Sequence, residues 1–193
     1  MRHQSCPAAT GWLSPVLASL RNALLDYLLS AALAEARRGL AEGGIPIGAV
    51  LAVDGEIIGR GHNRRVQRGS PILHAEIDCL QNAGRLSAST YRRAVLVSTL
   101  SPCDMCTGAA LLYKIPRIVI GENRTFCGPE DYLRERGVQL DVVDDSECRE
   151  LLETFILARS HIWHEDIGVG GTRSTELTLL RADELVYSAA GSM

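Results

Sequence analysis

The sequence lacks an excess of positive charge. Its 193 residues carry 20 Lys plus Arg against 23 Asp plus Glu, which gives a formal net charge of −3. No block of basic residues stands out along the chain. Proteins that grip nucleic-acid phosphates usually carry a basic excess, because that electrostatic attraction supplies much of their affinity. The charge balance therefore argues against a nucleic acid as the main substrate or partner.

An uninterrupted apolar run long enough to cross a membrane is also missing. Residues 11–34 are rich in Leu and Ala, but Arg21, Asn22 and Asp26 interrupt them, and a spanning helix needs about 20 consecutive apolar residues. A secretory signal would place basic residues ahead of the apolar run and a cleavage site after it. The start of this chain matches that pattern only in part, so we expect a cytoplasmic protein with no membrane partner.

The features of a disordered or a cysteine-stapled chain are absent too. Apolar residues make up 46% of the sequence and charged residues 22%, close to globular averages, and a chain this large and aliphatic needs no disulfide staples. Cys103 and Cys106 form a C-x-x-C pair, for which a metal or redox role is the better interpretation. The other four cysteines are expected to be buried, with inert thiols: Cys6, Cys79, Cys127 and Cys148.

The apolar pattern predicts helices alternating with strands. A helix is predicted over residues 22–42, after an irregular start with Pro7 and Pro15. Asp54-Gly55 is a hairpin turn signal. The predicted strands cover residues 45–53, 56–60, 94–99, 117–120 and 138–143. The further predicted helices cover residues 73–83, 102–113, 132–136 and 147–159, with a weak helical pattern over 175–187.

This order of elements predicts an α/β fold, a three-layer α/β/α sandwich. Strands that alternate with helices favour a sheet covered on both faces, here of about five strands, and the leading hairpin makes the sheet mixed. The sequence shows neither repeats nor an internal linker. We therefore divide it into an N-terminal extension over residues 1–25, one domain over 26–168 and a C-terminal extension over 169–193.

Two segments carry the residues of a metal site. His74-Ala75-Glu76 and Pro102-Cys103-Asp104-Met105-Cys106 each lie at the start of a predicted helix that follows extended chain. Cysteines at i and i+3 in a first helical turn point to the same side, where the helix dipole favours their thiolates. Two thiolates and the His74 imidazole leave a tetrahedral zinc ion one open position for water.

Glu76 is not needed as a ligand, which points to catalysis. A carboxylate beside zinc-bound water can take its proton and pass it to a leaving nitrogen. H-x-E followed by P-C-x-x-C is the signature of the zinc nucleobase deaminases. The sequence therefore predicts one zinc ion held by His74, Cys103 and Cys106, with Glu76 as the catalytic proton carrier.

Each motif alone has a less specific explanation. A lone C-x-x-C could be redox-active, or half of a structural zinc site completed by Cys79, Cys127 or His62. A lone His74 would more often be an ordinary polar residue. Glu76 separates these alternatives, because a structural zinc site has no use for it. The combined motifs favour the catalytic site.

Longer motifs resemble the fungal-type cytosine deaminases of the cytidine deaminase-like superfamily. The resemblance runs from Ala31 to Gly168, and its motifs lie at residues 43–48, 61–63, 99–108, 121–123, 142–145, 163 and 165–168. It implies a homodimer with one zinc ion in each subunit. It also implies hydrolysis of cytosine to uracil and ammonia, as in pyrimidine salvage.

The resemblance further implies which residues bind the base. Asn63 would bind its polar edge, and Asp166 would accept a hydrogen bond from its exocyclic amine. Phe126 and Trp163 would pack on the ring or close over it. Taken alone, Trp163 would more often be core packing and Asp166 a solvated charge. The other implied pocket residues are Ala75, Leu100 and Ser101, with Ile45 or Ile47 nearby.

Ala75 departs from the resemblance, because these cytosine deaminases usually have glycine there. H-A-E is common instead in tRNA adenosine and guanine deaminases, and residues 127–129 and His164 also differ from the expected pattern. The same chemistry on guanine, another aminated heterocycle or adenosine in tRNA therefore stays open. The acidic balance and the segment from Trp163 to Asp166 count against tRNA. A zinc-stabilised domain that binds without turnover is the second alternative.

Overall fold

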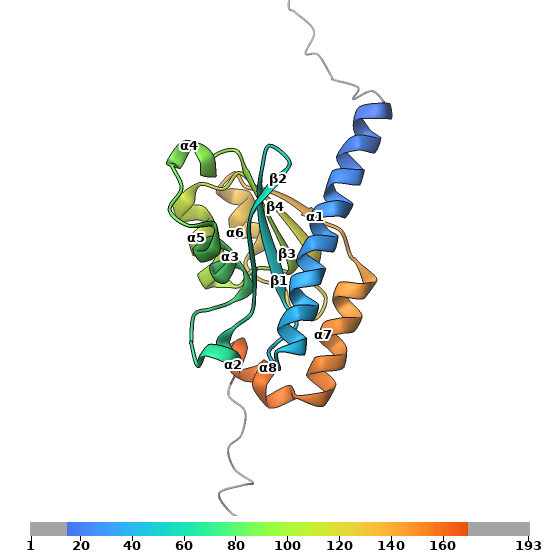
Figure 1. The fold of residues 1–193 in the computed structure, drawn as a ribbon, viewed down its shortest axis with the longest axis vertical. Helices are drawn as coiled ribbons and strands as arrows, with labels where there is room; N and C mark the ends of the chain where they lie inside the picture. The colour runs from blue at the N-terminus through green and yellow to red at the C-terminus, as the bar shows by residue number, and fades with distance from the viewer. Residues whose placement is uncertain (1–14, 170–193) are drawn as a thin grey trace, which may run out of the picture. The chain divides into compact units, whose positions relative to one another are not determined.

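The computed structural model describes residues 15–169 and contains a five-stranded mixed sheet (Figure 1). The strand order is β2-β1-β3-β4-β5. β1 pairs antiparallel with β2 and with β3, whereas β4 pairs parallel with β3 and with β5. The strands are β1 (Gly48–Val53), β2 (Glu56–His62), β3 (Ala94–Leu100), β4 (Arg117–Glu122) and β5 (Gln139–Val142).

The chain divides into two compact units between Glu153 and Thr154, and the sheet belongs to the first. Of the second unit, the structure describes the end of α7 (Ser146–Ala158) and α8 (Ser160–Asp166). Within residues 15–169, no helix combines the length and the apolar character needed to cross a membrane.

Helix α1 (Pro15–Ala41) covers one face of the sheet, and the start of α7 packs on the same face (Figure 1). Gly48 lets α1 approach β1 closely, because an added Cβ would lie 2.1 Å from the carbonyl oxygen of Ala32. Apolar burial of this kind is the main favourable contribution to folding. The buried residues at this interface include Leu28, Leu29, Ala32, Val50, Val97, Val119 and Cys148.

Helices α3 (Ala75–Ala83) and α5 (Asp104–Tyr113) cover the opposite face (Figure 1). At Gly61 an added Cβ would lie 2.2 Å from the backbone nitrogen of Cys79, so α3 contacts the backbone of β2. Side chains alternate between the two faces along a strand. Leu96 and Ser98 of β3 are buried under these helices, whereas Val97 faces α1. The predicted three-layer sandwich with a mixed sheet of five strands is confirmed.

Two helix starts differ from the sequence prediction because of proline. α1 begins at Pro15 rather than at residue 22, since proline is favoured in a first helical turn, where its missing N–H costs nothing. The predicted domain boundary at residue 25 thus falls inside α1. The helix predicted from Pro102 begins at Asp104, with Cys103 as its N-cap.

The first strand is also shorter than predicted. It starts at Gly48 rather than at Ile45, because Pro46 has no N–H to give to a sheet. The N–H of Ile47 donates to the oxygen of Ile45 instead. At the other end of the strand, the predicted hairpin turn is confirmed. Asp54 and Gly55 have φ values of 52° and 86°, as a two-residue turn of this kind requires.

Short helices account for most of the remaining differences. α2 (Arg65–Arg68), α4 (Ala88–Tyr91) and α8 were not predicted, since four to seven residues are too few for a helical period to show. α6 (Glu130–Glu135) begins two residues before the predicted helix over 132–136. The helical pattern predicted over residues 175–187 and the irregular segment 1–14 lie outside the described residues.

The prediction for the cysteines is right for two of them and wrong for one. Cys79 and Cys148 are buried, and burial raises the pKa of both thiols. Cys127 is exposed, contrary to the prediction. It lies in the loop between β4 and α6 rather than on a face of an element that packs on the core. Cys6 lies outside the described residues.

Candidate metal centre and active site

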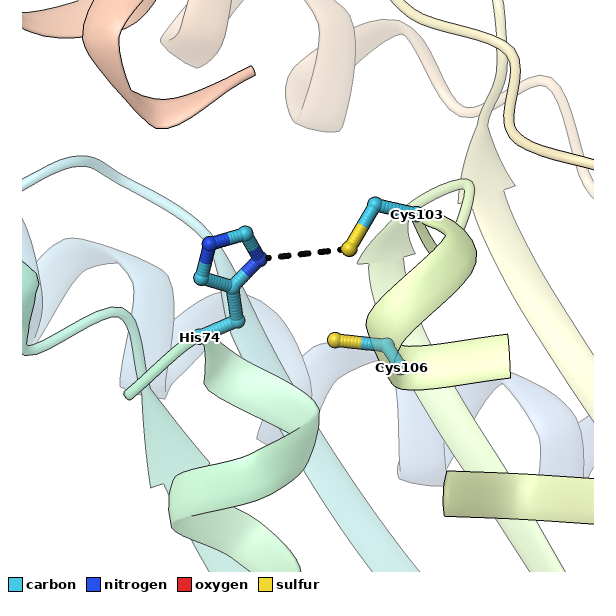
Figure 2. A group of neighbouring side chains, drawn as sticks. All are labelled: His74, Cys103 and Cys106. Carbon is cyan, nitrogen blue, oxygen red and sulfur yellow. Dashed lines mark hydrogen bonds between the residues drawn. The ribbon is translucent and has the colours of Figure 1, made fainter. Parts of the chain in front are cut away.

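His74, Cys103 and Cys106 come together at the start of two helices (Figure 2). His74 is the N-cap of α3, Cys103 is the N-cap of α5, and Cys106 lies in the first turn of α5. One ligand atom from each residue lies within 4.8 Å of the others, and Nδ1 of His74 is 3.5 Å from Sγ of Cys103. The predicted ligand set therefore forms one cluster.

The sheet explains why these helix starts meet. β3 runs directly into the loop that carries Cys103, and α3 packs on β1 and β2, of which β1 lies next to β3 in the sheet. Both helices therefore direct their N-termini, with free N–H groups and a partial positive charge, toward the same place. This environment favours thiolates, which are the form of cysteine that binds metal.

The pKa values of the two thiols shift in opposite directions. The hydrogen bond from Cys106 lowers the pKa of Cys103 to about 4, and His74 adds to this effect although partial burial opposes it. The same hydrogen bond raises the pKa of Cys106 well above its usual value, and burial reinforces the rise. Cys103 is thus ready as a thiolate, whereas metal binding must displace the proton of Cys106.

The donor set fits zinc. One imidazole nitrogen and two sulfurs are ligands that zinc prefers, and three protein ligands leave a tetrahedral ion one open position. Among residues 15–169, neither Cys79, Cys127 nor His62 joins the cluster as a fourth ligand. A closed structural site of four protein ligands is therefore not what these residues form.

Glu76 lies beside the ligands and is buried, with 4% of its surface exposed. The hydroxyl of Ser98 donates to its Oε1 at 3.0 Å, and the thiol of Cys106 donates to its Oε2 at 3.3 Å. Burial raises the pKa of Glu76, and the nearby charge of Cys103 raises it further. The carboxyl group is therefore fixed in position and suited to carrying a proton.

The other predicted site residues lie in several elements. Ala75 follows His74 at the start of α3, and Leu100 and Ser101 come just before Cys103; all three are buried. Asn63 is fully buried, and its Oδ1 accepts a hydrogen bond from the backbone N–H of Arg65 at 3.1 Å. Phe126 is half-buried in the loop after β4, and Trp163 and Asp166 are buried in α8.

The sequence analysis missed two residues that contact predicted site residues. Ser98 orients Glu76, and Glu130 accepts a hydrogen bond from Ser101 at 2.9 Å. A serine inside the apolar run of β3 was a usable signal, because a polar side chain facing a covered side of a sheet needs a partner. Glu130 gave no such signal, since it is the first residue of a short helix in a polar stretch.

A His-Cys-Cys cluster with a buried carboxyl group beside it, on this fold, defines a zinc-dependent hydrolytic deaminase. The chain belongs to the family described as the cytidine and deoxycytidylate deaminase zinc-binding region, whose model matches residues 23–122. That match includes every ligand and Glu76.

Individual relatives agree with this family. The chain is 48% identical to a cytosine deaminase of Candida albicans over 141 residues, which cover 72% of this chain and 94% of the relative. It is 39% identical to a tRNA-specific adenosine deaminase of Streptococcus pyogenes serotype M18 over 144 residues, which cover 67% and 87%. A solved structure from work on tRNA:A34 deaminases superposes with a TM-score of 0.56 at 30% identity and covers 66% of this chain and 99% of that one.

Proposed function

We propose that this protein hydrolyses cytosine to uracil and ammonia. The observation that carries the choice of substrate is the 48% identity to the Candida albicans cytosine deaminase, which extends over 94% of that relative. The type of reaction rests on the site itself, where the buried Glu76 contacts the ligand Cys106. A carboxyl group in that place has a use in proton transfer and none in a structural metal site.

The residues of the chain divide the work of the reaction. His74, Cys103 and Cys106 would hold the zinc ion, which when bound makes a water molecule acidic enough to react near neutral pH. Glu76 takes one proton from the water as its oxygen adds to C4 of the base, and delivers that proton to N3. It then takes the second proton from the new C4 hydroxyl and passes it to the amine, so that the C4–N bond breaks, ammonia leaves and C4 becomes the carbonyl carbon of uracil. Ser98 keeps Oε1 of Glu76 in place during both transfers.

The base pocket is the second part of the proposal. Asn63 binds the polar edge of the base, Phe126 and Trp163 pack on its ring, and Asp166 accepts a hydrogen bond from the amine. The burial of Asn63 supports its role, because specific polar groups of a ligand pocket lie among buried side chains. The roles of Phe126, Trp163 and Asp166 rest on the resemblance to the cytosine deaminases. Ala75, Leu100 and Ser101 complete the pocket.

A homodimer in the cytoplasm, acting in pyrimidine salvage, is part of the same proposal. Its support is the resemblance to the cytosine deaminases. We also keep the division into a deaminase domain over residues 26–168 with an extension at each end. Sedimentation of the purified protein tests the dimer, since a monomer at micromolar concentration would contradict it.

One observation favours a second substrate. Ala75 stands between a ligand and the proton carrier, where it is fully buried, and the chain also resembles a tRNA-specific adenosine deaminase at 39% identity. Compared with the glycine usual in the cytosine deaminases, Ala75 adds one methyl group between His74 and Glu76, which changes the shape of the proposed pocket. Guanine or adenosine in tRNA is therefore the alternative substrate to test beside cytosine.

Ammonia release from a panel of substrates tests the proposal. The zinc-loaded protein is given cytosine, cytidine, adenine, guanine and tRNA under the same conditions. We expect ammonia from cytosine, with uracil as the second product. Activity on guanine or tRNA but not on cytosine would replace the proposed substrate and leave the reaction type intact, whereas no activity on any of them would favour a binding domain without turnover.

A further inference from the structure

The loop between β4 and α6 lies directly against the loop that carries Cys103. We call residues 123–129 the Phe126 loop and residues 101–103 the ligand loop. The N–H of Gly128 donates to Oγ of Ser101 at 3.1 Å. An added Cβ at Gly128 would lie 1.8 Å from the carbonyl oxygen of Pro102 and 3.5 Å from Cα of Cys103. The two loops thus meet backbone to backbone, with no room for a side chain.

A single buried carboxylate ties both loops together. Glu130, of which 6% is exposed, accepts hydrogen bonds from Oγ of Ser101 at 2.9 Å and from Nδ2 of Asn123 at 3.0 Å. Its own N–H donates to the oxygen of Gly128 at 2.8 Å. Glu130 therefore contacts both ends of the Phe126 loop, through Asn123 and Gly128, and the ligand loop through Ser101.

The charge of Glu130 suits this role. Burial acts to raise its pKa, but the hydrogen bonds from Asn123, Ser101 and Arg134 outweigh burial and hold the pKa below its usual value. Hydrogen bonds to an ionised acceptor are about twice as strong as neutral ones. A residue with three donors directed at one ionised group is expected to fix their relative positions.

The neighbouring Glu122 orders the rest of the Phe126 loop. Its carboxylate accepts from the backbone N–H groups of Arg124 at 2.7 Å and Thr125 at 3.1 Å, and its carbonyl oxygen accepts from the N–H of Ser101 at 3.0 Å. Phe126 follows immediately. Its position thus depends on the same contacts that place the ligand loop.

We propose that Glu130 is a positioning residue that locks the Phe126 loop to the ligand loop, so that it governs both zinc retention at Cys103 and the choice among bases. The statement about bases rests on the proposed function. The statement about zinc rests only on the ligand cluster. Loss of Glu130 leaves the Ser101 hydroxyl and the Asn123 amide without this acceptor, and both loops gain freedom.

Zinc release is the first test, because it does not depend on activity. The zinc-loaded Glu130→Ala, Glu130→Gln and Asp131→Ala proteins are mixed with a chromophoric chelator and the rate of zinc transfer is recorded. We expect transfer to be about tenfold faster for Glu130→Ala, as for other partners beyond the ligands themselves. Glu130→Gln, which can still accept from Ser101, should be intermediate. Asp131 neighbours Glu130 on α6 and is 95% exposed at its side chain, so its variant should match the parent.

Steady-state kinetics with cytosine and guanine are the second test. We expect Glu130→Ala to raise KM for cytosine more than it lowers kcat, and to reduce the ratio of kcat/KM values for the two bases. The reason is that Phe126, proposed to pack on the ring of the base, loses its fixed position, whereas Glu76 stays in place. If the parent protein does not act on cytosine, the proposed function fails. The zinc measurement still decides the positioning role.

The outcomes separate cleanly. Faster zinc transfer from a Glu130→Ala protein with unchanged circular dichroism supports the proposal. Transfer at the parental rate, or an equal acceleration in Asp131→Ala, overturns it. If Glu130→Ala does not fold, Ser101→Ala replaces it under the same two criteria, since that change removes the hydroxyl through which the ligand loop binds both Glu130 and the N–H of Gly128.

Discussion

Glu76 is the residue whose replacement should separate zinc binding from turnover. In Glu76→Gln, the side chain keeps its shape and its hydrogen bond with Ser98 but cannot carry the proton. We expect zinc content to stay at one ion per chain and ammonia release to fall by about 10² to 10⁴-fold, the usual worth of a general acid–base group. Metal analysis and an ammonia assay on the same sample give both values.

A second variant at the same site controls for a general loss of structure. Ser98→Ala removes the hydroxyl that donates to Glu76 at 3.0 Å and leaves the carboxyl group in place. Its rate should fall less than that of Glu76→Gln. A Glu76→Gln protein that keeps its zinc and also its full rate would contradict the assigned role.

Two glycines give opposite expectations for stability. At Gly48 an added Cβ would meet the backbone of α1 at 2.1 Å, whereas at Gly108 in α5 there is nothing within 4 Å. Gly48→Ala should therefore lower the free energy of unfolding by about 1–3 kcal/mol, as overpacking does. Gly108→Ala should raise it by roughly 0.5–1 kcal/mol, because alanine is the better helix residue. Urea unfolding measures both changes in the free energy of unfolding. If Gly48→Ala also raised the free energy of unfolding, the close contact between Gly48 and α1 would not restrict the side chain at this position.

At this scale the sequence predicts what depends on spacing. The spacing of Cys103 and Cys106, like that of His74 and Glu76, lies within one short segment, so the motif can be recognised from the sequence alone. The roles of Ser98 and Glu130 cannot be recognised in this way, because their partners lie 22 and 29 positions away. Such contacts form only in the folded chain.

Among the elements, α1 is joined to β2 through a buried histidine. His62, of which 2% is exposed, contacts Glu35 through Nδ1 at 3.2 Å and Glu42 through Nε2 at 3.1 Å. Both carboxylates belong to the end of α1 or the residue after it. His62 directly precedes Asn63, so this connection fixes the chain next to the residue proposed to bind the base.

The pKa of Glu42 makes this connection sensitive to acid. The hydrogen bond with His62 is the largest cause that lowers this pKa, although burial opposes it. A lowered pKa in the folded state adds stability above the unfolded value, about 4.3, and this contribution disappears as the pH falls through the folded value. Glu42→Gln should be less stable than the parent at pH 7 by about 0.5 kcal/mol, because the group is partly exposed.

The test compares urea unfolding of Glu42→Gln and the parent at pH 7 and again below pH 4, with acid loss of zinc common to both proteins. The difference in free energy of unfolding should shrink toward zero at the lower pH. A difference that grows with acid would reverse the assigned sign.

The sequence pattern predicts the presence of helices and strands better than it predicts the residues at which they begin and end. Most of the predicted helices and strands exist, because the apolar pattern along a helix or a strand records which face is buried. The errors at Pro15 and Pro46 share a cause: the effect of proline depends on whether its missing N–H would have been used. That depends on position within a helix or sheet, which the apolar pattern does not reveal.

For the whole molecule, zinc should act as a structural clamp as well as a cofactor. The ligands join α3 to α5, and a ligand that binds only the folded state stabilises it by an amount that grows with the logarithm of the ratio of its free concentration to Kd. Removal of zinc should lower the free energy of unfolding by about 4 kcal/mol when free zinc had been 1,000-fold above Kd, which corresponds to roughly 8–16 °C in Tm.

Differential scanning calorimetry with and without a chelator measures this shift. Cys106→Ser serves as the control, since it removes a ligand and should already melt near the chelated parent. Chelation that leaves Tm of the parent unchanged would mean that the cluster holds no zinc under those conditions.

The position of the ligands at the caps of two helices has a consequence for how the chain assembles. His74 and Cys103 lie 29 residues apart, with β3 between them, so only a weak two-sulfur site exists until α3 has docked beside α5. A zinc probe added during refolding should therefore report a late event. Tight metal binding therefore marks the time at which α3 docks beside α5, and it reports this step without any label on the protein.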